Sequence, residues 1–332
     1  MFSAAAWAVG DLDGPIDRGL LGTLAWGGGP VTEQSRWDLA SVTKPIVGIA
    51  VLSLIEAGEL GLDDRVADHL PDYVGSDKAS LSVRELLTHT SGLPGSTPLY
   101  LDNPTRVDLL EAVRGLPLLA PPGAAVVYSS AGFILLGLIA EAASGRTLDR
   151  LVDERVVAPA GMRDTGFGLA AELRRLAVAT EDDPWRGRIV QGEVHDENAV
   201  VLGLPAGHAG LFSTLADMER LGRTLVDGGG PMLSPAGYRE MIAPRTDQLA
   251  LRRTLGWQGT DVVGSPVGDL AGPNSYGHTG FTGTSLWVDP DAGRYVVLLT
   301  NRVHPTRAER GFARLRRETH DIAFATTTPV RR

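Results

Sequence analysis

Hydrophobic residues near both ends of the chain fall in short runs that predict strands. Residues 4–9 and 20–26 are small apolar runs separated by turn-forming residues. Residues 285–288 and 294–300 are two further runs, and a turn-forming segment joins them. The pattern therefore predicts a sheet that is built from both ends of the chain.

A long apolar stretch that begins near Ser41 and ends at Gly58 predicts a buried helix. Pro45 is compatible with a helix only close to its first turn, so the helix must start near Ser41. We therefore expect this serine to lie at the N-terminal end of the helix.

The middle of the chain, from residue 62 to residue 206, has helical periodicity interrupted by turns and predicts a helical subdomain. After it, helices are predicted at residues 217–226 and 306–325. The helical segments predicted within the middle block are residues 81–88, 107–114, 132–143 and 148–157.

The composition is that of an ordinary globular protein. The chain has 332 residues, of which 43% are hydrophobic and 21% charged, enough for one large domain or two domains in close contact. Its net charge of −9 disfavours nucleic-acid binding, because no broad basic surface is available to neutralise phosphates. The chain has no cysteine, which excludes disulfides, a thiol nucleophile and a thiolate metal site. The nucleophile of any covalent chemistry is therefore expected to be an oxygen.

No targeting or membrane segment is predicted. The first residues carry no basic region, and Asp11 is reached too early for the apolar part of a signal peptide. No apolar run approaches the ~20 residues that cross a bilayer. We therefore expect a cytoplasmic protein without a membrane span.

Ser41 and Lys44 form the first candidate catalytic element. Residues three apart on a helix share one face, so the amine of Lys44 can reach the hydroxyl of Ser41. A serine hydroxyl is too weakly acidic to attack a carbonyl unaided, and a lysine in a partly dry pocket can accept its proton. The helix N-terminus adds partial positive charge that favours an oxyanion. The alternative is an N-capping serine beside a solvated lysine.

Tyr128 and Ser130 form the second element, just before an apolar run. Tyr128 can share the serine's proton with the lysine and deliver it to the leaving group, while Ser130 offers a hydroxyl to a substrate. The alternative is a buried tyrosine beside serines that cap a helix.

The segment His278-Thr279-Gly280-Phe281 forms the third element. Glycine at position 280 lets a substrate lie alongside the strand, and the N–H of Phe281 can pair with that of Ser41 as an oxyanion hole. The alternative is a strand that carries an exposed histidine.

In this order, the three elements resemble the Ser-x-x-Lys, Tyr-x-Asn/Ser and Lys/His-Thr-Gly motifs of the serine β-lactamase and penicillin-binding family. Other segments resemble the branch of that family that contains class C β-lactamase-related enzymes and esterases. The resemblance covers essentially the whole chain. The segments that carry it are residues 38–44, 86–93, 122–129, 161–165 and 277–281.

The resemblance implies an α+β fold. It is a three-layer α/β/α sandwich with an antiparallel sheet of about five strands, plus a mainly helical subdomain. The sheet domain would comprise residues 1–66 and 207–332, and the helical subdomain residues 67–206. The catalytic cleft would lie between them.

The resemblance also implies roles for individual residues. Ser41 would be the acylated nucleophile, and Lys44 with Tyr128 the proton-handling pair. No metal and no organic cofactor are implied. The oxyanion and substrate-binding positions would be Ser130, His278, Thr279, Gly280 and Phe281.

Two residues depart from the pattern of β-lactamases and transpeptidases. His278 stands where lysine is typical, so a permanent cation is replaced by an imidazole whose protonation state the sequence leaves open. Ser130 stands where asparagine is typical, which removes an amide that would hold an acylamino side chain. Both departures favour an esterase, amidase or peptidase over an efficient β-lactamase.

His195, Asp196 and His208 are secondary candidates. No His-Glu-x-x-His spacing is present and a third ligand would have to come from elsewhere, so a metal site is not expected. This region resembles a subgroup that contains bacterial cytoplasmic muropeptide amidases, which remove the peptide from N-acetylmuramic acid. The alternative is a hydrogen-bond network that fixes a loop over the cleft. The segments that resemble the subgroup are residues 194–199, 207–212 and 301–305.

The sequence thus predicts hydrolysis of an ester or amide bond through an acyl-enzyme on Ser41, with a muropeptide amide as the candidate substrate. Two alternatives stay open: acyl transfer to an amine or alcohol, and a penicillin-binding-like receptor that acylates once without turnover. The expected partner is a small ester, amide or muropeptide rather than a nucleic acid, and the sequence does not predict the oligomeric state.

Overall fold

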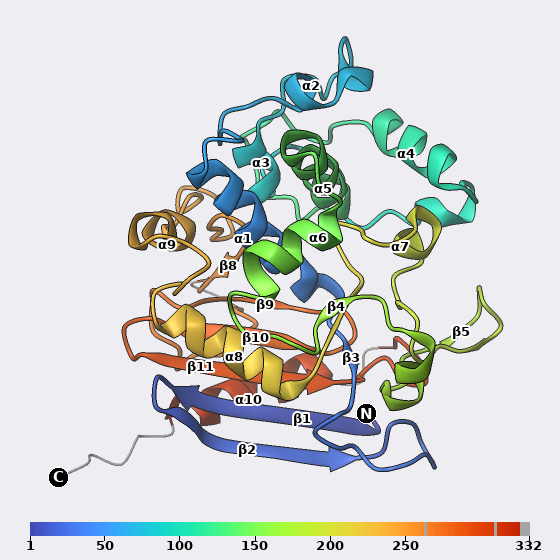
Figure 1. Ribbon diagram of the computed structural model, residues 1–332, viewed down its shortest axis with the longest axis vertical. Coiled ribbons are helices and arrows are strands. Elements are labelled where there is room, and N and C mark those ends of the chain that lie inside the picture. The colour runs from blue at the N-terminus through green and yellow to red at the C-terminus, as the bar shows by residue number, and fades with distance from the viewer. Residues whose placement is uncertain (262–263, 309–310, 326–332) are drawn as a thin grey trace.

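A six-stranded antiparallel sheet forms the base of the fold. The computed structural model describes residues 1–261, 264–308 and 311–325. The strands are β1 (Ala4–Asp11), β2 (Gly14–Gly22), β8 (Gln258–Gly259), β9 (Tyr276–Thr279), β10 (Ser285–Asp289) and β11 (Arg294–Thr300). Their order in the sheet is β2-β1-β11-β10-β9-β8, so that the two ends of the chain meet where β1 pairs with β11 (Figure 1). The predicted sheet built from both chain ends is confirmed, with a short sixth strand, β8, at its edge.

The N-terminal hairpin differs from the prediction. Its second strand was expected at residues 20–26 but begins at Gly14. Asp11 pairs with Gly14, so only Leu12 and Asp13 form the loop, and most of the turn-forming segment belongs to the strands. β2 is an edge strand whose side chains are mostly exposed or half-buried, which explains why it lacks a continuous apolar run.

Helices cover both faces of the sheet. α8 (Leu215–Val226) packs on β1, β10 and β11, and α10 (Phe312–Ala325) lies against the other face. Side chains of β11 alternate between the two faces: Val297 belongs to the main core, whereas Val296 packs with Ala323 of α10. The predicted three-layer α+β arrangement is therefore confirmed.

The closing helix begins later than predicted. It was expected from residue 306, but α10 starts at Phe312. The described residues before it form a loop, because Pro305 interrupts regular structure and the side chain of Arg307 is held by the acids Glu181 and Glu197.

The remaining helices gather above the sheet in Figure 1. α1 (Thr43–Glu56) is buried along almost its whole length and packs against α5 (Ser130–Ser144), α6 (Leu148–Val152) and α9 (Pro235–Ile242). A helix that is apolar all round is stable only when neighbours cover every face. The other helices are α2 (Val66–His69), α3 (Val83–Leu87), α4 (Arg106–Gly115) and α7 (Glu197–Leu202), and a π-helical turn, Asp153–Val157, continues α6.

Two small sheets tie distant segments together. β3 (Trp37–Asp38) pairs with β7 (Leu211–Ser213), which also pairs with β4 (Gly166–Phe167). β5 (Asp182–Asp183) and β6 (Arg188–Ile189) form a separate hairpin. Because β3 ends three residues before Ser41, the first of these sheets anchors the segment that carries the nucleophile.

No single helix among the described residues combines the length and apolar content needed to cross a membrane. The segments Ser130–Ser144 and Leu148–Val157 reach that length and content only together, across a bend of 85°.

Candidate active site

Ser41 lies in a tight turn that leads directly into α1, as predicted. The residue before it, Ala40, has a φ of 47°, a backbone conformation that non-glycine residues rarely adopt. Asp38 Oδ1 accepts the N–H of Ala40 at 2.8 Å, and Thr284 Oγ1 donates to the carbonyl of Leu39 at 2.9 Å. These bonds hold the strained turn and so fix the position of the nucleophile.

Lys44 is completely buried and contacts the nucleophile. Its Nζ lies 3.1 Å from Ser41 Oγ and donates to the carbonyl oxygen of His208 at 3.0 Å. The geometry is that of an amine placed to accept the serine proton.

Tyr128 and Ser130 reach the same cavity from the end of a loop and the first residue of α5. The Nζ of Lys44 lies 4.9 Å from the centroid of the Tyr128 ring. The phenolic oxygen of Tyr128 is buried and has no hydrogen-bond partner among the described residues. Ser129 caps α5 through its side chain, so the capping role expected as an alternative falls on this serine alone.

His278 and Thr279 lie at the end of β9 and line the cavity. His278 is buried, so the expected alternative of an exposed histidine is wrong. Burial, together with the nearby cations Lys44 and Arg253, lowers the pKa of His278 to about 3. The imidazole is therefore neutral at physiological pH, which answers the question that the sequence left open.

Gly280 is required by the packing of the turn after β9. A Cβ at this position would stand 2.0 Å from Thr284 Oγ1 and 2.5 Å from the carbonyl oxygen of Leu39. The glycine therefore lets the turn after β9 pack against the nucleophile turn. Gly280 also lines the cavity, and its role in making room for a substrate stays a prediction. Phe281 lines the cavity with a half-exposed ring, and within the described residues its N–H has no backbone acceptor, so its use as an oxyanion donor with Ser41 stays a prediction.

The cavity beside Ser41 has a volume of about 570 Å³ and carries several charged side chains. Arg253 lines it and is 6% exposed. Its Nε has no partner, and no carboxylate of the described residues forms an ion pair with it. Burial lowers the pKa of this guanidinium, with Asp261 acting in the opposite direction. The cavity thus contains a buried cation that has no ion-pair partner among the described residues.

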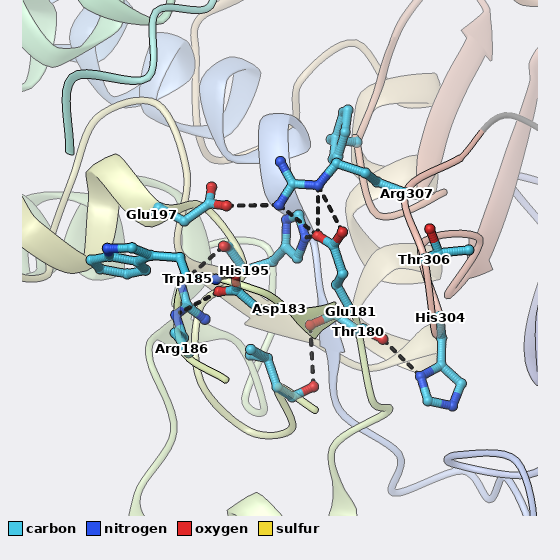
Figure 2. Close-up of polar contacts among 12 residues, drawn as sticks. Thr180, Glu181, Asp183, Trp185, Arg186, His195, Glu197, His304, Thr306 and Arg307 are labelled. Atoms are coloured by element: carbon cyan, nitrogen blue, oxygen red, sulfur yellow. Dashed lines mark hydrogen bonds and ion pairs between the residues drawn. The ribbon is translucent and has the colours of Figure 1, made fainter. Parts of the chain in front are cut away.

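His195 is part of a charged network at the cavity wall (Figure 2). Its Nε2 lies 3.0 Å from Glu181 Oε2. Its backbone N–H donates to Asp38 Oδ2 at 2.6 Å. Arg307 donates to both Glu181 and Glu197. Burial opposes ionisation of Glu181, but the hydrogen bonds from His195 and Arg307 outweigh it and lower its pKa to about 2. The network ties the loop that carries His195 to the nucleophile turn.

Asp196 and His208 form a second pair. Asp196 caps α7, and its Oδ1 lies 2.9 Å from Nε2 of the fully buried His208. Burial raises the pKa of Asp196, but the charges of His208 and Lys44 outweigh it and hold that pKa below its usual value. The carbonyl oxygen of His208 accepts a hydrogen bond from Lys44 Nζ. The Asp196–His208 pair therefore supports the position of the lysine.

These contacts support the loop-fixing interpretation of His195, Asp196 and His208. Within residues 1–261, 264–308 and 311–325, no three histidine, aspartate or glutamate side chains are grouped as a metal site requires.

Several residues of the site carried no recognisable sequence signal. Glu181, Arg253 and Arg307 stand far from the three motifs and reach the site only through the fold. Asp38 offered a weak signal, because it lies three residues before Ser41, where an acidic side chain can bond the turn.

Comparison with known proteins agrees with this geometry. The family model described as Beta-lactamase matches residues 16–321. The chain belongs to the β-lactamase family. It is similar to an Escherichia coli (strain K12) protein named "Putative D-alanyl-D-alanine carboxypeptidase", with 32% identity over 312 residues that cover 84% of this chain and 71% of the relative.

Two solved structures share its fold. "EstCE1, a hydrolase with promiscuous acyltransferase activity" is 23% identical, with a TM-score of 0.78 over 96% of this chain and 94% of that chain. Simvastatin synthase (LovD) from Aspergillus terreus is 21% identical, with a TM-score of 0.77 over 98% of this chain and 94% of that chain. This β-lactamase-family protein is thus a serine hydrolase with a β-lactamase/transpeptidase-like fold, and its family implies a small ester or amide substrate.

Proposed function

We propose that this β-lactamase-family hydrolase cleaves an amide bond of a cell-wall-derived muropeptide. The observation that carries the proposal is the cavity of about 570 Å³ that joins Ser41 to the guanidinium of Arg253, which has no ion-pair partner among the described residues. A cavity of this size holds much more than a short acyl chain. A buried cation without a carboxylate partner favours an anionic substrate, because the ligand's charge offsets the cost of burial. Muropeptides combine amide bonds with several carboxylates.

The residues around Ser41 support a two-step reaction. Ser41 Oγ attacks the amide carbonyl while Lys44 Nζ takes its proton. The tetrahedral intermediate collapses as Tyr128 gives its proton to the leaving amine, and the tyrosine regains a proton from Lys44. Water then attacks the acyl-enzyme ester, which releases the carboxylic acid and restores Ser41.

The comparisons support amide chemistry. The name of the Escherichia coli relative describes a carboxypeptidase of D-alanyl-D-alanine. The subgroup resemblance around residues 194–199 instead favours the bond between the lactyl group of N-acetylmuramic acid and the first amino acid. We propose the latter bond for this chain.

The test incubates wild type and Ser41→Ala with an N-acetylmuramyl peptide that ends in D-alanyl-D-alanine, and follows products and protein adducts by mass spectrometry. We expect wild type to release the whole peptide from N-acetylmuramic acid, and Ser41→Ala to be slower by at least about 10³-fold. A p-nitrophenyl ester run in parallel shows whether each preparation can be acylated.

Each other outcome contradicts part of the proposal. Release of the terminal D-alanine alone would overturn the amidase assignment in favour of a carboxypeptidase. Transfer of the acyl group to an added amine, instead of hydrolysis, would make the protein an acyltransferase. A stable adduct without product would make it a receptor that acylates once. Unchanged turnover in Ser41→Ala would overturn the nucleophile.

A further inference from the structure

His89 is a buried histidine that the proposed reaction does not use. It follows the end of α3, is 3% exposed and has a φ of 58°, in the left-handed region of the backbone. Non-glycine residues adopt this conformation rarely, and histidine is among those that tolerate it best. Such a residue persists in a core only when the contacts around it hold it there. In this protein several of those contacts lead to Tyr128.

His89 contacts the segment around Tyr128 in three ways. Its carbonyl oxygen accepts the N–H of Val127 at 2.8 Å. Its Nδ1 accepts the N–H of Ser129 at 3.1 Å. Its ring lies against the ring of Tyr128, with centroids 4.6 Å apart and planes at 48°. One histidine therefore binds both neighbours of the tyrosine and the tyrosine ring itself.

The imidazole of His89 is held in the form that these contacts need. Burial, together with the nearby cations Arg253 and Lys44, keeps the pKa of His89 well below its usual value. The ring is therefore neutral, and Nδ1 keeps the lone pair that receives the N–H of Ser129. The ring also packs against Phe133, with centroids 5.1 Å apart, which restricts its orientation.

Tyr128 depends on such support because its own hydroxyl supplies none. The phenolic oxygen is buried and has no hydrogen-bond partner among the described residues. The direction of the phenol must therefore come from the main chain and from groups packed on the ring. Besides His89, the Nζ of Lys44 lies 4.9 Å from the ring centroid of Tyr128, and the ring of His278 lies 5.8 Å away between centroids.

We propose that His89 is a positioning residue that holds Tyr128 in line to deliver a proton to the leaving group. The inference rests on the proton-donating role given to Tyr128 in the proposed function. It goes beyond that function because it assigns the support of the proton donor to a residue outside the three catalytic motifs. A small displacement of a reacting group costs about 10²-fold in rate, so loss of this support should be measurable.

The test uses two esters with the same acyl group. A p-nitrophenyl ester expels a stable anion that needs no proton, whereas an alkyl ester needs a proton on its leaving oxygen. In His89→Gly the left-handed turn is kept, because glycine adopts a φ of 58° without strain. We expect kcat/KM for the alkyl ester to fall by about 10²-fold and kcat/KM for the p-nitrophenyl ester by less than about 10-fold. Counting active sites by the acyl adduct removes any effect of unfolded protein.

A matched pair of variants separates positioning from packing, even if His89→Gly fails to fold. In His89→Asn the Oδ1 acceptor stands as many bonds from the backbone as the imidazole Nδ1, and asparagine tolerates the left-handed conformation. His89→Gln moves the same acceptor one carbon further out. We expect His89→Asn to keep most of the wild-type ratio of kcat/KM between the alkyl and p-nitrophenyl esters. We expect this ratio to fall in His89→Gln. Equal preference in the two variants would overturn the role of Nδ1.

A double-mutant cycle with Tyr128→Phe tests whether His89 acts through Tyr128 and whether Tyr128 donates the proton. If His89 acts through Tyr128, adding His89→Gly to Tyr128→Phe should cost little more for the alkyl ester. A full additional loss, or equal losses on both esters in His89→Gly alone, would overturn the inference. If Tyr128→Phe itself slows the two esters equally, the proton-donating role of Tyr128 fails, and with it the mechanism of the proposed function.

Discussion

Arg253 is the residue whose buried positive charge most directly supports the proposal of an anionic substrate. It is buried beside the neutral His278, so it supplies a cation to the cavity on the side where the typical lysine is absent. Among the described residues, no oxygen accepts a hydrogen bond from its guanidinium. Replacing Arg253 therefore leaves no buried acceptor without its hydrogen-bond donor, and the protein should still fold.

The prediction for Arg253 is a loss of selectivity. Wild type should cleave an amide substrate with a free carboxylate on the leaving group faster than the same substrate with a carboxamide. In Arg253→Gln this preference should shrink by about 10- to 100-fold in kcat/KM, as expected for one charge-assisted hydrogen bond of about 1.5 to 3 kcal/mol. Arg253→Lys keeps the positive charge but not the paired N–H donors of a guanidinium. Its preference for the carboxylate should lie between those of wild type and Arg253→Gln. Equal slowing of both substrates would show that Arg253 supports the fold rather than the carboxylate.

At this scale the sequence predicted residues that lie in a local pattern or in a family motif, and it missed those that reach the site only through the fold. Ser41 and Lys44 are three apart on one helix face, so their contact follows from helix geometry. Glu181 and Arg253 share no such spacing with Ser41. The state of His278 could not be predicted either, because its pKa depends on burial and on cations that come from other elements.

Among the elements, the loop that carries Arg307 binds the segment from residue 180 to residue 197, part of which lines the cavity. Its guanidinium bonds Glu181, next to β5, and Glu197, the first residue of α7 (Figure 2). The same loop bonds the wall through His304 Nδ1, 2.8 Å from the carbonyl oxygen of Thr180. Arg307 therefore couples the end of the sheet to the segment from residue 180 to residue 197.

Arg307→Gln should loosen this segment more than it destabilises the protein. We expect amide hydrogen exchange to accelerate across residues 180–197. The free energy of unfolding should fall by no more than about 1 kcal/mol, because the guanidinium is 41% exposed and solvent screens its ion pairs. Arg314→Gln removes an Arg–Glu pair of α10 in which both side chains are exposed, and it is the control for loss of an arginine charge away from the cavity wall. If amide exchange across residues 180–197 is unchanged in Arg307→Gln, Arg307 does not hold this segment in place.

The elements themselves were predicted best where one pattern dominates. The periodic segment behind α5 and the apolar run of β11 gave nearly correct bounds. β2 was misplaced because an edge strand carries polar residues, which look like a turn. The closing helix was predicted too long because the bond between Arg307 and Glu181 joins residues far apart in the sequence.

For the whole molecule, buried histidines determine how stability depends on pH. Burial lowers the pKa values of His89, His278, His304 and His320, to about 3 for His278 and His320. In the unfolded chain these groups titrate near 6.5. Between pH 6.5 and pH 3 the unfolded state therefore binds more protons than the folded state. Stability must then fall as the pH drops through this window, and it is fully present above it.

The melting temperature should accordingly decrease from pH 7.5 to pH 5. Glu181, whose pKa is lowered from 4.5 to about 2 by folding, adds to the loss mainly below pH 4.5, where the unfolded chain takes up its proton. Each histidine with a folded-state pKa near 3 contributes roughly 2 kcal/mol to this loss at pH 5. His320→Asn tests the argument, because His320 is buried against Ser285 Oγ at 3.0 Å and lies outside the proposed catalytic groups. The variant is expected to be less stable at pH 7.5 but to lose less stability on acidification, since one titrating group is gone. A melting temperature that is flat between pH 7.5 and pH 5, or an unchanged slope in His320→Asn, would mean that the buried imidazoles take up protons without unfolding.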